Sequence, residues 1–346
     1  MIARPSAPSL PHLRVLVLTN MYPGPRAPEW GVFIAEQVRS LRELISVRVV
    51  AKRDRSASAY LPFALRSVAA SMSASWDLVH AHYGFHSALV PALFSRRPLV
   101  ITFHGSDALI EPHRRRIYAK LQRHVVGRAD RLIAVSQEVA QRLVDELGAD
   151  PAKVVHIPCG VDTVLFRSRE QAGARAKLGI PVDGKVILFV GRLSRMKGVD
   201  LLQAAARELG AVQFYFAGDG DVRWQADNCH FVGTRPHAEI CEWLNAADLL
   251  VLPSRSEGTP VTVLEALATE TPVVCSRVGA CPELIAHGRT GLLVEPGDAA
   301  GLTAALREAL AMDLQPSSGR EMIKEKFDLA VIARKLVDVY REVVRG

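Results

Sequence analysis

The chain has 346 residues, about twice the length of a typical domain, so its length predicts two domains of roughly 150 to 170 residues. Hydrophobic residues make up 49%, aromatic residues 6% and charged residues 23% of the chain, which excludes disordered, collagen-like and coiled-coil proteins. No apolar run approaches the roughly 18 to 20 residues that span a bilayer, which excludes a membrane-spanning helix. The five cysteines form no CxxC pair, which favours a reducing compartment and predicts no zinc site.

Most of the formal net charge of +7 lies in one segment. Between Arg96 and Arg131, nine Lys or Arg residues face three acidic residues, a local excess of +6. Such a block predicts an anionic partner, which is a membrane surface, a phosphorylated substrate or nucleic acid; a solvent-exposed helix face is the alternative. Residues 1–13 are rich in Pro and Ser and lack the apolar segment of a signal peptide, so they predict a flexible tail on a cytoplasmic protein.

In the first half of the chain, short β-branched runs alternate with segments of helical period, which is typical of a parallel α/β sheet. One helix is expected over 31–44, with Phe33 and Ile34 on its apolar face, and another over 137–147, with Ser136 as its N-cap. The strands expected in this half are 15–18, 47–50, 78–80, 99–102, 132–135 and 154–157.

The second half repeats this scheme. Segments 129–136 and 247–254 share one form, Ala-Asp followed by an apolar strand and Ser, as two similar domains would produce. The predicted fold class is therefore α/β, with two Rossmann-like, doubly wound parallel-sheet domains that face a cleft holding the ligand site. The strands expected in this half are 186–190, 214–217, 230–232, 249–252, 273–275 and 292–294. The predicted organisation is a tail over 1–13, an N-terminal domain over 14–165, a linker over 166–184, a C-terminal domain over 185–328 and a helix over 329–346 that packs back on the N-terminal domain.

A basic loop follows the first strand of the second half. Arg192, Arg195 and Lys197 come after the strand end at Gly191, and a helix is expected from about Asp200. Arginine forks and a lysine charge beside a helix N-terminus suit a diphosphate group. A surface loop that is basic by chance is the alternative.

Another loop, 254–260, leads from the strand 249–252 into a helix, with Thr259 as the expected N-cap and Pro260 at the first helical position. Glu257 lies in this loop, whereas Glu265 lies inside the apolar helix, where a carboxylate needs a partner. Vicinal sugar hydroxyls are suitable partners for Glu265, and a structural Arg or Lys is the alternative.

Two weaker patterns are open to structural explanations. Asp219-Gly220-Asp221 has the DxD form of a Mg²⁺ or Mn²⁺ site, but its position after a strand favours a turn. His80 and His82 end the third strand, where they line a second substrate or simply pack. The first strand lacks a GxGxxG motif, which argues against an oxidoreductase.

Taken together, these motifs resemble the retaining GT-B glycosyltransferases of glycosyltransferase family 4 (glycosyl transferases group 1). The resemblance covers the chain from about Arg14, with the motifs in the expected order. The segments that carry it are GVFIAEQVRSLREL at 31–44, FHGSD at 103–107, ADRLIAVS at 129–136, IPCGVD at 157–162, GRLxxxKG at 191–198, AGDG at 217–220, ADLLVLPS at 247–254 and SxxEGxP with LEA at 254–266.

The resemblance implies a nucleotide-sugar donor site on the C-terminal domain. Arg192 and Lys197 would bind the donor diphosphate, and Glu265 would bind the ribose hydroxyls. Glu257 would bind the transferred sugar, together with the backbone of Gly258, Thr259 and Pro260. Because the cations neutralise the leaving diphosphate, no metal ion and no other cofactor are expected.

On the N-terminal, acceptor domain, the resemblance places the loop at Gly31 near the diphosphate and His104 near the transferred sugar. His104, Glu257, Arg192 and Lys197 would form the catalytic group. His82, Tyr83 and Asp107 are expected on the acceptor side.

The chain departs from the family pattern at three places. Trp30 stands where the family often has a glycine before Gly31, so this loop carries a bulky ring where the family's loop approaches phosphate. Cys159 stands where Asn is common, which questions a side-chain role there. Residues 221–228 are too few for the usual helix, which leaves one edge of the base pocket open.

The basic block is expected to form an amphipathic helix over 113–126, with an apolar stripe that includes Ile117 and Val125. An anionic membrane or a lipid-diphosphate acceptor would explain it, and nucleic acid fits less well because no binding motif accompanies the charge. The residues expected to face the membrane are Arg114, Arg115, Arg116, Lys120 and Arg123.

The sequence thus predicts a hexosyltransferase that uses a UDP- or GDP-sugar and retains the anomeric configuration. The acceptor would be a hydroxyl of a sugar, a glycolipid or a lipid-linked molecule in bacterial glycolipid, cell-wall or surface polysaccharide synthesis, reached from the cytoplasmic face of the membrane. A nucleotide-sugar epimerase of the same fold is one alternative, and it would turn over the donor alone. A catalytically silent subunit that binds sugar nucleotides is the other.

Overall fold

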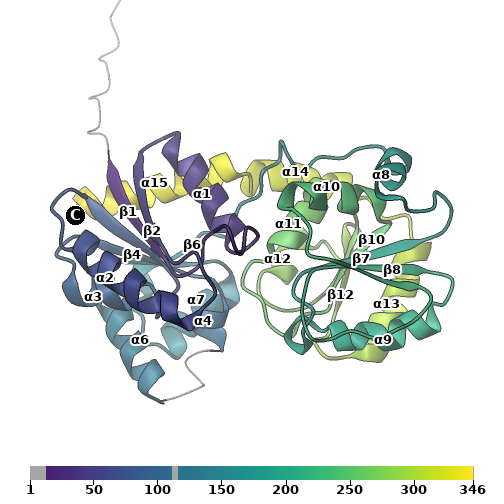
Figure 1. Ribbon diagram of the computed structural model, residues 1–346, viewed down its shortest axis with the longest axis horizontal. Helices are drawn as coiled ribbons and strands as arrows, with labels where there is room; N and C mark the ends of the chain where they lie inside the picture. Colours follow the sequence, from purple (N-terminus) through teal and green to yellow (C-terminus); the bar gives the residue numbers. More distant parts are fainter. Residues whose placement is uncertain (1–12, 111–115, 346) are drawn as a thin grey trace, which may run out of the picture.

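The computed structural model describes residues 13–110 and 116–345 as two α/β lobes side by side (Figure 1). The N-terminal lobe contains a six-stranded, fully parallel sheet in the order β2-β1-β3-β4-β5-β6. Its strands are β1 (Arg14–Thr19), β2 (Ser46–Ala51), β3 (Leu78–His82), β4 (Leu99–Phe103), β5 (Arg131–Ala134) and β6 (Val154–His156). Its helices are α1 (Val32–Arg42), η1 (Ala57–Ala59), α2 (Tyr60–Ser71), α3 (Leu89–Phe94), α4 (Ser106–Leu109), α6 (Arg116–Arg128), α7 (Gln137–Asp145) and η2 (Pro151–Lys153).

The C-terminal lobe repeats the architecture with a parallel sheet in the order β12-β11-β10-β7-β8-β9. Its strands are β7 (Val186–Val190), β8 (Gln213–Ala217), β9 (Cys229–Gly233), β10 (Leu249–Leu252), β11 (Val273–Ser276) and β12 (Gly291–Val294). Its helices are α8 (Gln171–Leu178), η3 (Arg195–Lys197), α9 (Val199–Glu208), α10 (His237–Ala246), α11 (Val261–Ala268), α12 (Cys281–Leu284), α13 (Ala299–Ala311) and α14 (Ser317–Lys326). The predicted class of two doubly wound parallel-sheet domains is confirmed, and every expected strand overlaps one of these strands.

The strand order reverses once in each sheet, between β1 and β3 and between β7 and β10. Open α/β sheets bind ligands beyond the carboxyl ends of their strands at such a switch point. The segments that leave these four strands carry Gly31, Tyr83, Lys197 and Glu257. The topology alone therefore brings four of the sequence-predicted residues to the two ligand-binding edges.

The last helix, α15 (Leu329–Arg345), crosses from the C-terminal lobe to the N-terminal lobe and lies along α1 (Figure 1). Ile332, Leu336 and Tyr340 are completely buried there, in the same apolar core as β1 and α1. The Tyr340 hydroxyl bonds to Nδ1 of His80 at 2.7 Å. Helix α15 is thus part of the apolar core of the N-terminal lobe, and it connects the two lobes.

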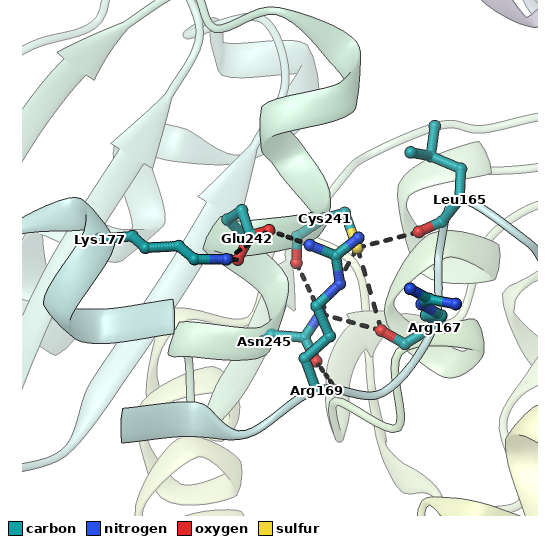
Figure 2. Close-up of polar contacts among 7 residues, drawn as sticks. All are labelled: Leu165, Arg167, Arg169, Lys177, Cys241, Glu242 and Asn245. Atoms are coloured by element: carbon teal, nitrogen blue, oxygen red, sulfur yellow. Dashed lines mark hydrogen bonds and ion pairs between the residues drawn. The ribbon is translucent and has the colours of Figure 1, made fainter. Parts of the chain in front are cut away.

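The segment expected to link the lobes lies against α10 of the C-terminal lobe (Figure 2). The side-chain amide of Asn245 donates to the carbonyl of Arg167 at 3.1 Å and accepts from the backbone N–H of Arg169 at 2.6 Å. Glu242 pairs with the side chains of Arg169 and Lys177. Because the amide of Asn245 binds both a backbone N–H and a backbone carbonyl of this segment, it fixes the position of the segment before β7 begins.

Candidate active site

The basic loop after β7 meets the loop after β10 through an ion pair. The Nζ of Lys197 lies 2.7 Å from Oε1 of Glu257, and the Ser254 hydroxyl donates to the same oxygen at 2.6 Å. The Glu257 side chain is only 8% exposed, whereas Lys197 retains 32% and Arg192 is exposed. The loop therefore presents two cations at the carboxyl edge of the sheet, with a buried carboxylate holding one of them.

Close backbone packing fixes this loop. Gly198, with φ +69°, lies where a Cβ atom would overlap the carbonyl of Pro253. Only glycine combines this conformation with so close an approach. Gly198 also immediately precedes α9, so the first N–H groups of that helix lie beside Lys197.

His104 follows β4 and lies in a cluster of rings. Its Nε2 is 3.0 Å from Nδ1 of His82, and its ring packs against those of Tyr83 and Phe33. Burial lowers the pKa of His104 well below 6.5, and His82 lowers it further. Burial also lowers the pKa of His82, to about 3. Both imidazoles are therefore neutral near pH 7, so His104 offers a hydrogen bond rather than a charge.

Two imidazole nitrogens of this cluster, Nδ1 of His104 and Nε2 of His82, are buried and have no hydrogen-bond partner among the described residues. Buried polar atoms without partners are rare and often mark a place where a ligand or water binds. Tyr83 beside them has φ +78°, an uncommon conformation for a bulky residue. Such strain persists only where the surroundings enforce it, and it concentrates at functional sites.

Asp107 was expected on the acceptor side, but the structure places it underneath the site. It is completely buried, and its carboxylate accepts hydrogen bonds from the backbone N–H groups of Gly84, His104 and Gly105 at 2.8 to 3.0 Å. Burial raises the pKa of Asp107 to about 6, although these bonds oppose the shift. Its role is to hold the turn that carries His104.

The two lobes touch at this turn through glycine backbones. A Cβ atom on Gly105 would lie 2.7 Å from the N atom of Gly258, and one on Gly258 would overlap the carbonyl of His104. A void of about 10 Å³ beside His104, lined also by Phe33 and Cys159, is the size of one water molecule. The contact thus brings the backbone of Gly258 against the His104 turn, and the adjoining void cannot hold a sugar.

Thr259 does not cap α11, so the predicted capping role was wrong. Its hydroxyl donates to the carbonyl of Val135 and accepts from the N–H of Cys159 at 3.3 Å, both in the N-terminal lobe, and Pro260 takes the N-cap position. Burial raises the pKa of the Cys159 thiol to about 12, so this residue contributes its backbone and not a thiolate. Thr259 therefore joins the lobes.

Glu265 has a partner that the sequence did not indicate. Its Oε1 lies 2.6 Å from Nε2 of His237 at the start of α10, and Nδ1 of His237 lies 3.2 Å from Glu36 on α1. Burial lowers the pKa of His237, but the bonds to Glu265 and Glu36 outweigh it and raise the pKa to about 10. Burial raises the pKa of Glu265, and His237 opposes that shift. A protonated His237 thus bridges two carboxylates from opposite lobes.

This bridge predicts a pH-dependent stability difference between the wild type and His237→Gln. The pKa of His237 rises from 6.5 to about 10 on folding, so its contribution is fully present below pH 6.5 and is lost as the pH rises towards 10. Urea unfolding at pH 6, 8 and 10 should show the largest loss of stability at pH 6 and the smallest at pH 10. The exposed His124→Gln serves as the control, and an equal loss at all three pH values would contradict the bridge.

The remaining sequence-predicted positions have simple local environments. Gly31, with φ +76°, is the N-cap of α1, where a Cβ atom would lie 2.7 Å from the backbone of Met21. The side chain of Asp219 accepts from the N–H of Gly220 and pairs with Arg223, which agrees with a turn. The described residues contain no cluster of three or more metal-ligating side chains. Residues 221–228 form no helix, and Trp224 packs there on Phe216.

The amino-acid sequence of the chain is similar to those of known proteins. Residues 11–165 match the family model described as Glycosyltransferase Family 4, and residues 184–312 match the one described as Glycosyl transferases group 1. A protein of Bacillus subtilis named as a teichuronic acid biosynthesis glycosyltransferase, TuaC, is 28% identical over 96% of this chain and 99% of its own length. D-inositol 3-phosphate glycosyltransferase 1 of Catenulispora acidiphila is 31% identical over 78% of this chain and 73% of its own length.

Solved structures share the fold. Sucrose-phosphate synthase of Thermosynechococcus elongatus superposes with a TM-score of 0.81 at 22% identity, over 96% of this chain and 99% of that one. Anabaena HepE in complex with UDP gives 0.79 at 21% identity, over 95% and 100% of the two chains. The two lobes therefore have the GT-B architecture. The chain belongs to glycosyltransferase family 4, the glycosyl transferases group 1, and is a glycosyltransferase.

Proposed function

We propose that this enzyme transfers a hexose from a UDP- or GDP-sugar to an acceptor hydroxyl and retains the anomeric configuration. The observation that carries the proposal is the position of Arg192 and Lys197 at the carboxyl end of β7, on the lobe that faces His104 through the Gly105–Gly258 contact. Solved structures of HepE contain UDP and UDP-glucose, which supports a nucleotide-sugar donor. The relatives named for teichuronic acid and for inositol 3-phosphate support a sugar or phosphorylated sugar as the acceptor class.

The chemistry assigned to the C-terminal lobe is stabilisation of the leaving diphosphate. Its negative charge grows as the glycosidic bond breaks, so Arg192, Lys197 and the first N–H groups of α9 would stabilise the transition state more than the bound donor. Glu257 is held by Lys197 and Ser254, which positions it for sugar hydroxyls rather than as a free nucleophile. We therefore propose attack by the acceptor on the same face from which the diphosphate leaves.

Neutral His104 would bind a hydroxyl of the transferred sugar through its unpartnered Nδ1. The other ring nitrogen is engaged by His82 at 3.0 Å, which fixes the orientation of the ring. Gly258 lies against the His104 turn in this structure, so donor and acceptor would enter when the lobes move apart. Closure of the lobes around the bound substrates, with Gly258 again near the His104 turn, would exclude water during transfer.

A panel of nucleotide sugars tested by thermal unfolding would identify the donor, because a ligand at 100 times its dissociation constant adds about 2.7 kcal/mol of stability. Product analysis with and without acceptor then tests the transfer. Turnover of the donor alone would indicate an epimerase, and donor binding without any turnover would indicate a silent subunit. NMR of the new linkage tests retention. Loss of activity in EDTA, restored by Mn²⁺, would contradict the proposed independence from metal ions.

We also propose that the N-terminal lobe docks on an anionic membrane that holds the acceptor. Among the described residues, no helix has the length and apolarity to cross a bilayer. α2, α3 and α6 lie together on this lobe (Figure 1), and they and the residue that follows α2 expose apolar side chains that are 48% to 68% accessible. These exposed side chains are Leu61, Leu65, Met72, Leu93, Phe94 and Ile117. Lys120 and Arg123 on α6 are exposed as well, so this group of helices carries both exposed apolar and exposed basic side chains.

The observed helix differs from the amphipathic helix expected over 113–126. α6 begins at Arg116, and Arg114 and Arg115 lie outside the described residues. Val125 is completely buried in the protein core while Ile117 is 54% exposed, so only the first part of the apolar stripe is available to a membrane. Docking would therefore rest on charge and on the neighbouring apolar side chains of α2 and α3.

This docking predicts that Arg115, Arg116, Lys120 and Arg123, changed together to Gln, abolish sedimentation with anionic vesicles while activity on a short soluble acceptor survives. About 1 kcal/mol per basic residue near an anionic surface makes four such residues sufficient for reversible binding, and salt should weaken it. A matched control removes four exposed cations of the other lobe: Arg207, Arg307, Lys324 and Lys326. A wild type that ignores anionic vesicles at low salt would refute the membrane proposal.

A further inference from the structure

The N-terminal lobe contains a basic pocket away from the donor loops. It has a volume of about 340 Å³, which lies within the range of roughly 300 to 1,000 Å³ of small-molecule sites. It is located at the carboxyl end of β2, the edge strand of the sheet, between the loop that precedes α1 and the start of α2. The residues that line it are Pro25, Arg26, Ala51, Lys52, Arg53, Asp54, Ala59, Pro62 and Arg66.

Lys52 supplies a buried charge to the pocket. It is 2% exposed, its Nζ donates to the carbonyl of Asp54 at 2.5 Å, and the rings of Trp30 and Tyr60 each lie 4.5 Å from that atom. A buried ammonium is rare unless it is paired, and here its direct contacts are a neutral carbonyl and two aromatic faces. Trp30, which replaces the glycine common in the family, thus helps to hold a cation.

Two further cations of the pocket also contact neutral groups. Arg66 donates to the carbonyls of Pro62 and Ala51 at 3.1 and 3.5 Å, and the guanidinium of Arg53 lies 5.4 Å from the ring centre of Tyr22. Arg53 and Arg66 are exposed, and neither forms an ion pair within 4.0 Å with another residue that the structure describes. No carboxylate of the described residues therefore neutralises these two guanidinium charges within ion-pair distance.

Asp54 is the single acid that lines the pocket, against four basic residues, a net charge of +3. Its Oδ2 pairs with Arg26 at 3.2 Å, and its Oδ1 accepts from the N–H of Ser56 at 2.7 Å. The single negative charge of Asp54 cannot neutralise the four positive charges that line the pocket. The pocket therefore has unbalanced positive charge beside the buried Lys52, where electrostatic interactions are stronger than in bulk water.

We propose that this pocket binds a phosphoryl group carried by the acceptor. The proposal rests on the proposed function, because β2 belongs to the lobe assigned to the acceptor. A phosphate monoester carries about −1.5 to −2 charge at pH 7 and three acceptor oxygens, which matches +3 and two arginine forks better than one carboxylate does.

The position of the pocket sets the size of the acceptor. Lys52 follows β2 directly, and its N–H bonds to Thr19 at the end of β1; β3 and β4, which leads to His104, are the next strands. Three strand spacings of about 4.8 Å place the pocket about 14 Å from the end of β4. A phosphoryl group bound there would hold an acceptor of more than one sugar unit, or a lipid-linked one, with its far end at His104. Exposed Leu61 and Leu65 next to Pro62 and Arg66 on α2 would suit a lipid chain.

The test is calorimetric titration of the full-length protein with inorganic pyrophosphate, in the background Arg192→Gln with Lys197→Gln, which removes the donor loop as a binding site. Binding of one equivalent is expected. Adding Arg53→Gln and Arg66→Gln should weaken it by about tenfold or more, because two charged hydrogen bonds are lost. Arg307→Gln with Arg334→Gln removes the same charge from exposed positions and should leave it unchanged. No binding to the background protein, or equal binding after the pocket changes, would overturn the proposal.

Two further probes identify the chemistry and its source. Glucuronate should bind at least tenfold more weakly than pyrophosphate, and equal binding would overturn the phosphoryl assignment. Dihexanoyl phosphatidate is then compared with inorganic phosphate. Tighter binding of the phosphatidate that is lost in the variant Leu61→Ser with Leu65→Ser supports a lipid-linked acceptor. Equal binding of the two ligands supports a soluble phosphorylated sugar. Failure of the proposed transferase function is distinguishable, because it would abolish turnover and leave pyrophosphate binding in place.

Discussion

Replacing Lys197 by Ala should lower kcat by about 100-fold or more, and Arg192→Ala should act in the same direction. A charged hydrogen bond to an anion that develops in the transition state is lost, and removal of one such donor costs on the order of 10² to 10³ in rate. Lys197 leaves about a third of its side chain exposed beside the first N–H groups of α9, where a diphosphate would lie.

Lys197→Ala also leaves Glu257 without its ion-pair partner, so the comparison needs a control. Arg195→Ala removes an exposed cation from the same loop and should reduce the rate only a few-fold. Urea unfolding of each variant checks the fold. A loss confined to KM, with kcat unchanged, would indicate that Lys197 binds the donor equally in ground and transition states. Wild-type rates in both Lys197→Ala and Arg192→Ala would reject the donor site.

Most of the fold can be predicted from local patterns in the sequence. Most strands are short, continuous apolar runs because strands inside a parallel sheet are buried on both faces, and such runs can be recognised without knowledge of their neighbours. Val15 to Leu18 of β1 and Ile187 to Phe189 of β7, for example, are almost inaccessible. Ser136 caps α7 as its position predicts, since a cap depends on the next three residues alone. The loops after β7 and β10 could be placed for the same reason.

Tertiary contacts of single polar side chains, including those between the lobes, could not be predicted, because a local pattern does not record which partner the fold brings to a side chain. Glu265 was recognised as a buried carboxylate, but its partner His237 and the second acid Glu36 lie on different helices, one of them in the other lobe. Thr259 has the residue type and position of a cap, yet the carbonyl of Val135 takes its hydroxyl. Asp107 has the polarity of a substrate ligand, and only the structure shows three backbone N–H groups around its carboxylate.

Gly258→Ala should lower kcat/KM by about 100-fold. The added methyl group would overlap the carbonyl of His104 and lie 2.8 Å from Cγ2 of Val135, so the lobes could not return to the contact that this structure shows. A displacement of about 1 Å between reacting groups is enough to cost roughly 10² in rate. Nucleotide binding should change little, because Lys197 and Glu265 lie in the C-terminal lobe and do not move with the His104 turn.

The control for this variant is Gly127→Ala on α6, where a Cβ atom would meet no other atom within 4 Å. It should keep wild-type activity and gain about 0.5 to 1 kcal/mol of stability, since alanine is favoured over glycine in a helix. Small-angle scattering should show a larger radius of gyration for Gly258→Ala in the presence of donor, and no change for Gly127→Ala. If Gly258→Ala retains activity within twofold, the Gly105–Gly258 contact is not part of the reactive state, and His104 must reach the sugar with the lobes further apart.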